Sequence, residues 1–158
     1  MTWRGSPTTL EKIFACLPYL IPLLDGLSFA APFFQQFPAL QVVLIPLLPL
    51  LTIYSLPFVS LIVFFALFLL VVRNENIKHF IRFNAMQAIL LSIVVFLCRL
   101  IVDYVLGPVL RGGLLIETLS NVVFLGILAA VIYSVAQSIM GRYAEIPTLS
   151  DAVHMQVR

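Results

Sequence analysis

RNENIKHFIRFNAMQ, at residues 73–87, is the one markedly polar stretch in the apolar interior of this sequence. Residues 26–72 before it carry no charged side chain, and neither do residues 83–98, which overlap its end. The cations that lie between these two apolar segments are Arg73, Lys78 and Arg82. A short basic stretch of this kind is typical of a cytoplasmic loop that joins two transmembrane helices. It therefore predicts a membrane protein that turns back at this loop.

The composition indicates the same class of protein. Hydrophobic residues make up 62% of the 158 residues and charged residues only 10%. Soluble domains carry about 25% charged residues, so this chain lacks the side chains for a water-facing surface. We expect a single membrane domain over residues 1–158, with the lipid bilayer as its surroundings. The net charge of +2 is spread thinly, so no nucleic-acid partner is expected.

The N-terminal stretch lacks the pattern of a secretory signal or of a transit peptide. The apolar run after Lys12 is interrupted by Pro18, Pro22 and Asp25, and no small-residue cleavage site follows it. We therefore expect the mature protein to begin at this N-terminus. Within the same region, Thr8 and Glu11 have the spacing of a capping box that starts the first helix.

The apolar runs predict an all-α, polytopic fold with four transmembrane helices. Their approximate bounds, with the polar tail that follows, are 10–34, 57–72, 83–105, 114–141 and 142–158. Seven prolines lie between residues 18 and 57, and each removes a backbone hydrogen-bond donor. Irregular backbone cannot face lipid. Residues 31–56 are therefore predicted to form a proline-broken segment, between the first and second spans, in the membrane interface or against the other helices.

The basic residues are distributed unevenly between the two sides of such a protein. Of the nine Lys and Arg residues, seven fall on one side and only Arg99 and Arg111 on the other. The seven are Arg4, Lys12, Arg73, Lys78, Arg82, Arg142 and Arg158. Because basic loops stay in the cytoplasm, both termini are predicted to face the cytoplasm or its organellar equivalent, the stroma.

Polar side chains inside the spans are candidate functional residues. Asp25 is an acidic group that could lie at membrane depth, where such groups are costly and often functional. The alternative, which we favour, places it at the interface beside Gly26, where the first helix ends or bends. Asn84 and Gln87 are three residues apart and share one helix face. They either bond across helices, the simpler expectation, or line a path for a substrate.

Small residues recur every fourth position on the last span. They are Gly126, Ala130, Ser134 and Ser138. Such a ladder lets a second backbone approach closely. It predicts tight helix packing without choosing between a partner in the same chain and a partner in another copy.

The sequence offers no pattern that indicates catalysis, a cofactor or a metal site. It contains no HExxH, GxSxG or SxxK motif, and His79 and His154 are far apart. Cys16 and Cys98 stand singly in apolar segments, which is typical of small core residues rather than of a disulfide. We therefore expect that the protein is not an enzyme.

Several longer stretches resemble one known family, the Tic twenty-kilodalton family. They are ACLPYLIPLLDGL (15–27), FQQFPALQ (34–41), SLPFVSLIVFFALFLLVVRNENIKHFIRFNAMQAILL (55–91) and IPTLSDAVHMQV (146–157). The most specific part is VRNENIKHFIRFNAMQAIL (72–90), and it contains Arg82, Asn84, Met86 and Gln87. These residues, with Asp25, are the family-motif candidates for a path or for helix packing.

The resemblance implies a membrane component of the protein-import translocon of the chloroplast inner envelope, or a cyanobacterial or plastid-encoded relative of it. It implies four transmembrane helices and a role in protein translocation, with a preprotein-conducting channel as one form of that role. Other translocon subunits, preproteins and further copies of the chain would then be the partners. The implied location is a cyanobacterial membrane, first the plasma membrane, or the plastid inner envelope. The alternative function is a non-conducting scaffold or assembly factor for other membrane complexes.

Overall fold

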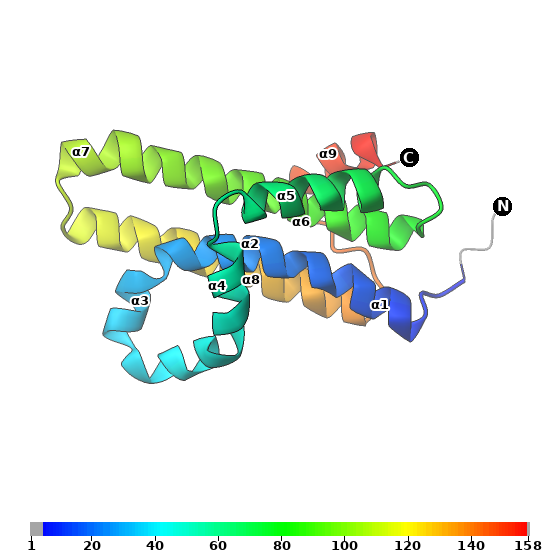
Figure 1. Ribbon diagram of the computed structural model, residues 1–158, viewed down its shortest axis with the longest axis horizontal. Helices are drawn as coiled ribbons and strands as arrows, with labels where there is room; N and C mark the ends of the chain where they lie inside the picture. Colours follow the sequence, from blue (N-terminus) through cyan, green and yellow to red (C-terminus); the bar gives the residue numbers. More distant parts are fainter. Residues whose placement is uncertain (1–4, 158) are drawn as a thin grey trace.

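The computed structural model describes residues 5–157 (Figure 1). Within this range the chain is helical throughout, so the predicted all-α class is confirmed. The elements of the first half are α1 (Thr9–Cys16), η1 (Leu17–Tyr19), α2 (Leu20–Gly26), η2 (Leu27–Phe29), α3 (Ala31–Gln36), η3 (Pro38–Leu47), α4 (Leu48–Tyr54), α5 (Val59–Ala66) and η4 (Leu67–Val72). Those of the second half are α6 (His79–Leu100), η5 (Ile101–Leu106), α7 (Gly107–Leu110), α8 (Leu114–Ile139) and α9 (Leu149–Gln156).

Three helices of the described range are long and apolar enough to cross a membrane. They are Thr9–Phe29, His79–Leu110 and Leu114–Ile139, with 21, 32 and 26 residues. At about 1.5 Å per residue they measure about 31–48 Å, and a hydrocarbon core measures about 30 Å. The chain is therefore a polytopic membrane protein.

The first of these helices begins at the predicted capping box. Glu11 N–H donates to the Thr8 hydroxyl at 3.3 Å, and Thr8 N–H donates to the Glu11 carboxylate at 3.0 Å. Of the two expectations for Asp25-Gly26, an end or a bend of the helix, the end is not observed, because the helical run continues past Gly26. It passes through the prolines by tightening into the short turn η1 and continues to Phe29. A 3₁₀ turn next to an α-helix accommodates missing donors in this way.

The fourth crossing is bent rather than straight. Pro38–Tyr54 and Val59–Val72 qualify as a span only when they are taken together, and they meet at an angle of 93°. Val59–Val72 consists of 8 and 6 residues in α5 and η4, about 21 Å of helix, which is shorter than the hydrocarbon core. Phe58 forms the corner with a positive φ of 66°. The prediction that prolines break this region is confirmed by the short elements α3, η3 and α4.

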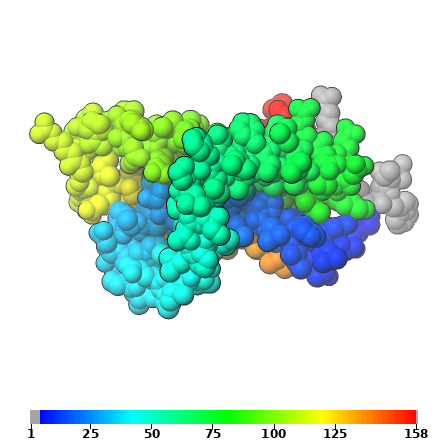
Figure 2. Space-filling view, viewed as in Figure 1, coloured from blue at the N-terminus to red at the C-terminus, as the bar shows by residue number. Residues whose placement is uncertain are grey.

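Figure 1 shows how these passes are arranged. The start of α1, the loop between η4 and α6, the end of α8 and the helix α9 lie at one end of the molecule, and α7 lies at the other. The segment α3–η3–α4 projects from the side of the bundle, as Figure 2 shows in light blue to cyan. Of its residues none is fully buried. The bundle therefore consists of α1–η2, α6 and α8, with α5–η4 laid along α6.

Two clusters of buried apolar side chains hold the bundle together. The larger joins the first helix to α6 and α8, and it includes Tyr19, Ala88, Leu91, Phe124 and Ile127. The smaller joins η4, α6 and α9, and it includes Val72, Phe83, Met86, Val153 and Val157. The predicted polar tail at 142–158 thus contains a helix that is packed on α6 through its apolar residues.

Within one copy of the chain, the small-residue ladder on α8 is only partly a packing surface. Ser134 and Ser138 are fully buried and Ala130 is half-buried, whereas Gly126 is exposed and has no neighbouring atom within 4 Å of an added Cβ. The buried face of α8 is instead Ser120, Phe124, Ile127, Val131, Ser134 and Ser138. Because each residue turns the helix by about 100°, a repeat of four drifts by about 40° per step. The ladder therefore rotates out of the interface toward its N-terminal end.

The close approach between helices occurs at a different glycine. A Cβ added to Gly26 would lie 3.0 Å from Cγ2 of Ile127 on α8. Ile127 is buried and its branched side chain has little room to move. Gly26 therefore lets α2 and α8 pack at this point.

We predict opposite consequences for alanine at the two glycines. Gly126→Ala should raise the free energy of unfolding by up to about 1 kcal/mol, because alanine favours the helix and meets no neighbour there. Gly26→Ala should be less stable than Gly126→Ala by about 1 kcal/mol or more, because the methyl group strains the contact with Ile127. Unfolding of the purified variants in detergent micelles measures both values. Equal gains for the two variants would contradict this packing.

Candidate functional site

A cluster of polar side chains lies fully buried between the three long helices. Asn84 and Gln87 come from α6, Tyr19 from η1, and Ser134 and Ser138 from α8, and each is at most 1% exposed. The Tyr19 hydroxyl donates to Asn84 Oδ1 at 2.9 Å, and the Ser138 hydroxyl shares its one proton between this oxygen at 3.0 Å and the Ser134 carbonyl at 2.8 Å. We call these five residues the polar cluster.

The remaining hydrogen bonds of the polar cluster lie within α6 or run from α6 to its two neighbours. Asn84 Nδ2 donates to the Phe80 carbonyl at 2.8 Å, so both ends of this amide are bonded. Gln87 Nε2 donates to the Tyr19 hydroxyl at 3.1 Å and lies 3.4 Å from the Ser134 hydroxyl. Gln87 Oε1 has no partner within the described residues. Asn84 is therefore the better satisfied of the two amides.

The predicted family-motif residues do not all meet at one place. Arg82 is 8% exposed, and its Nε donates to the Val72 carbonyl at 2.8 Å. It thereby bonds a carbonyl at the end of η4, a position that a helix leaves without an internal partner. Met86 is buried in the apolar cluster shared with α9. Only Asn84 and Gln87 belong to the polar cluster, whereas Arg82 and Met86 fix the neighbouring elements to α6.

Tyr143 and His79 connect the segment before α9 to the start of α6. His79 Nδ1 lies 3.0 Å from the Tyr143 hydroxyl, and His79 Nε2 lies 3.2 Å from the Val157 carbonyl. The Phe83 ring stacks edge-on against Tyr143, with ring centres 5.0 Å apart. These contacts give His79 a structural position. Among the described residues no group of three or more His, Cys, Asp or Glu side chains is placed to hold a metal ion.

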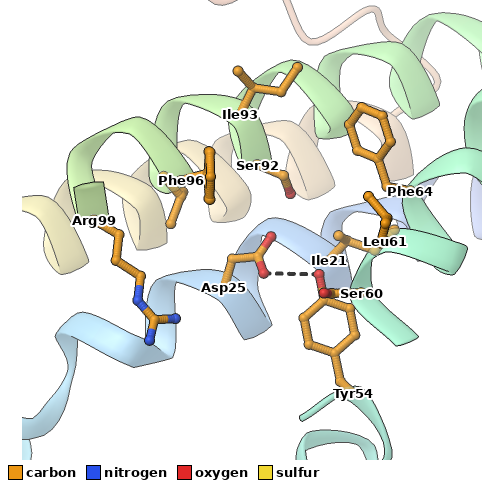
Figure 3. Close-up of a pocket in the computed structure, with 11 residues that line it drawn as sticks. Ile21, Asp25, Tyr54, Ser60, Leu61, Phe64, Ser92, Ile93, Phe96 and Arg99 are labelled. Atoms are coloured by element: carbon orange, nitrogen blue, oxygen red, sulfur yellow. Dashed lines mark hydrogen bonds between the residues drawn. The ribbon is translucent and has the colours of Figure 1, made fainter. Parts of the chain in front are cut away.

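Asp25 lies apart from the polar cluster, on the wall of a cavity of about 360 Å³ (Figure 3). The cavity opens to the side of the bundle, between the first helix, α5 and α6. Asp25 Oδ1 accepts a hydrogen bond from the Tyr54 hydroxyl at 2.9 Å. The buried Ser92 hydroxyl points toward the carboxylate without completing a hydrogen bond and has no other partner within the described residues. We call this space the lateral cavity.

Arg99 closes the polar end of the lateral cavity. Its side chain comes from the last turn of α6, and Figure 3 shows it on the opposite side of Asp25 from Tyr54. Arg99 Nε also lies 3.3 Å from Asp103 Oδ2, a pairing that their spacing of four residues on a helix allows. Asp25 thus lies between a hydroxyl donor and a guanidinium group.

Two tyrosines are essential to these sites and were not predicted from the sequence. Tyr19 bridges both amides of the polar cluster, and Tyr54 bonds Asp25. Tyr19 could have been found from the sequence. A tyrosine hydroxyl buried in an apolar span needs a hydrogen-bond partner, and the other spans contain few polar side chains that could serve as one. Nothing local indicates Tyr54, since its contact depends on how the proline-broken segment folds back.

Long apolar helices, a bent fourth pass and polar groups bonded inside the bundle define a polytopic membrane protein. The family is shown by comparison with known proteins. The chain belongs to the Tic20 family, because the family model described as "Chloroplast import apparatus Tic20-like" matches residues 4–153.

Relatives from cyanobacteria and from plastids support this assignment. The chain is 54% identical over 149 residues to a Tic20 family protein of Synechocystis, covering 94% of this chain and 93% of the relative. It is 31% identical to the chloroplastic protein TIC 20-II of Arabidopsis thaliana, covering 99% and 76%. It is 34% identical to the Tic20 family protein Ycf60 of Gracilaria tenuistipitata, covering 95% and 76%.

We predict that the polar cluster stabilises the bundle and that its two amides contribute unequally. Asn84→Leu and Gln87→Leu should each lower the free energy of unfolding by about 1 kcal/mol or less, as is usual for hydrogen bonds between membrane helices. Asn84→Leu should cost more, because Asn84 forms three of the bonds and Gln87 leaves a buried oxygen without a partner.

Gln36→Leu is the matched control, because it removes an exposed amide outside the bundle. Its effect should stay within about 0.5 kcal/mol. Denaturation in detergent micelles measures all three variants. A larger loss for Gln36→Leu than for Asn84→Leu would contradict the role of the cluster.

Proposed function

We propose that this chain is a membrane subunit of a protein-translocation machinery, without a catalytic role of its own. The observation that carries the proposal is the family match over residues 4–153. Three relatives are named as chloroplastic TIC 20 proteins, and the family description names the chloroplast import apparatus. Other membrane subunits of the same machinery, and the polypeptides that it moves, are the proposed partners.

The packing of the bundle supports a particular form of this function. The amides that could have lined a path are bonded to one another and to neighbouring helices at 2.8–3.4 Å. Apolar side chains fill the space around them. We therefore propose that one copy does not conduct a polypeptide through its own interior. A path would form between its outer surface and other chains, including further copies of this one.

A second candidate function is a scaffold that assembles other membrane complexes and contacts no translocating polypeptide. The exposed apolar surface supports the scaffold as well as it supports the translocon subunit. Side chains on this surface, such as Phe65 and Tyr104, are 50% and 76% exposed. The two functions differ in what touches this surface. A translocon subunit contacts the moving polypeptide, whereas a scaffold contacts only its assembly partners.

The test is photo-crosslinking in the native membrane with azidophenylalanine in place of single aromatic residues. Phe58, Phe65 and Tyr104 are exposed positions, and Phe124, which is 3% exposed, is the buried control. A polypeptide arrested during translocation should crosslink to at least one exposed position and not to position 124.

Each other outcome of this experiment has a definite meaning. Crosslinks to membrane subunits alone, with none to the arrested polypeptide, would favour the scaffold. A crosslink at position 124 that disappears when the polypeptide is chased through would overturn the closed interior.

We also propose that both termini face the cytoplasm or stroma, in a cyanobacterial plasma membrane or a plastid inner envelope. Support comes from the described cations, because Lys12, Arg73, Lys78, Arg82 and Arg142 belong to the end of the bundle where α1 starts. Arg4 and Arg158, which also enter the predicted charge bias, lie outside the described residues. Arg99 and Arg111 belong to the opposite half.

Labelling of single cysteines, introduced into a variant without Cys16 and Cys98, tests the orientation. An impermeant reagent added from outside the cytoplasm should modify a cysteine at Gly112 and leave one at Asn76 unmodified. Asn76 and Gly112 are both exposed and lie in connections between helices. Their accessibility to the reagent should therefore differ only through the side of the membrane on which each one lies. The reverse labelling pattern would overturn the proposed orientation.

A further inference from the structure

The lateral cavity lies along the half of α6 that is farther from the basic end of the bundle. Ser92 and Arg99 are 13 and 20 residues beyond His79, the first residue of α6. At about 1.5 Å per residue, they lie about 20 Å and 30 Å from the basic end of the bundle. A hydrocarbon core is about 30 Å thick. With the basic end placed at one membrane surface, the apolar part of the cavity falls inside such a core and Arg99 falls at its opposite edge.

One end of the cavity offers both hydrogen-bond acceptors and donors. The Asp25 carboxylate accepts a hydrogen bond from the Tyr54 hydroxyl through Oδ1, which leaves Oδ2 as a further acceptor. Ser92 is 6% exposed, and its hydroxyl points at this place without a partner. A buried polar group without a partner costs stability unless a ligand or water supplies the bond. The guanidinium of Arg99 provides donors beside them.

The rest of the cavity is apolar and reached from the side. Its wall is formed by Ile21, Leu61, Phe64, Ile93 and Phe96. Leu61 and Phe96 are 52% and 59% exposed although they line the cavity, so the wall is continuous with the lipid-facing surface. An apolar chain can therefore enter from the membrane without crossing a polar barrier.

We propose that the lateral cavity binds one diacyl lipid whose headgroup donates hydrogen bonds. Ammonium or hydroxyl groups of the headgroup contact the Asp25 carboxylate and the Ser92 hydroxyl. A phosphate or ester oxygen of the same lipid accepts from Arg99, and an acyl chain follows the wall formed by Phe64 and Phe96. This inference does not depend on the proposed role in translocation.

The donor requirement follows from the chemistry of the polar end. As a carboxylate beside the guanidinium of Arg99, Asp25 accepts hydrogen bonds and donates none, and in this form it favours headgroups with N–H or O–H groups. Phosphatidylethanolamine and a monoglycosyl diacylglycerol carry such groups, whereas the trimethylated headgroup of phosphatidylcholine carries none. The comparison separates hydrogen bonding from general affinity for lipid, because the acyl chains can be kept identical.

Native mass spectrometry of the full-length chain, released from detergent micelles with equal amounts of these lipids, tests the proposal. The wild-type chain should retain one molecule of either donor lipid with about tenfold higher affinity than phosphatidylcholine, as expected for a charge-assisted hydrogen bond. Asp25→Asn and Ser92→Ala should reduce this preference. Equal retention of all three lipids by the wild-type chain, a measurement that needs no variant, would overturn the proposal.

A matched pair of arginine variants identifies the cavity as the place of binding. Arg99→Gln should weaken retention of the donor lipids, and Arg111→Gln should not. Both changes remove one guanidinium from the same half of the molecule, but only Arg99 lines the cavity. Equal effects of the two variants would overturn the assignment to this site. A photo-crosslinking residue in place of Phe96 that reacts with a translocating polypeptide, and not with a lipid, would also overturn the assignment to this site.

Discussion

The hydrogen-bonded amide of Asn84 is the point on which the arrangement of the three long helices depends. Its oxygen accepts from Tyr19 on the first helix and from Ser138 on α8, and its nitrogen donates to the backbone of α6. Lipid offers no water to replace these bonds, so a polar side chain in a membrane bundle must find partners in the protein. The apolar contacts around it permit many alignments of the helices, whereas these bonds permit few.

The molecule consists of two parts with different properties, the bundle that the polar cluster holds together and the segment beside it. The interior of the bundle is filled and bonded, which supports a role performed at the surface of the chain. The segment α3–η3–α4 has no fully buried residue and is linked to the bundle through contacts such as that of Tyr54 with Asp25. The lateral cavity lies where these two parts meet. The lateral cavity therefore opens at the side of the bundle, next to the bent pair of helices Pro38–Tyr54 and Val59–Val72.

The sequence predicted the helical class, the membrane location, the capping box and the proline-broken region, because each depends on local composition or spacing. It also placed Asn84 and Gln87 on one face of a helix. It did not identify Tyr19 or Tyr54, whose partners are far away along the chain, and it treated residues 142–158 as a tail although Val153 and Val157 are buried against α6. Within one copy the ladder on α8 leaves the interface at Gly126, because a repeat of four does not match 3.6 residues per turn, and packing of Gly126 against another copy stays a prediction.

A double-mutant cycle between Tyr19→Phe and Asn84→Leu tests most directly whether the residues of the polar cluster stabilise the bundle together. Tyr19→Phe removes only the hydroxyl that Asn84 accepts from, so the ring keeps its apolar contacts. The free energies of unfolding in detergent micelles should show a coupling of about 0.5 kcal/mol or more between the two changes. The pair Tyr19→Phe and Gln36→Leu, which share no contact, should be additive. Additive effects for Tyr19→Phe and Asn84→Leu as well would contradict the account.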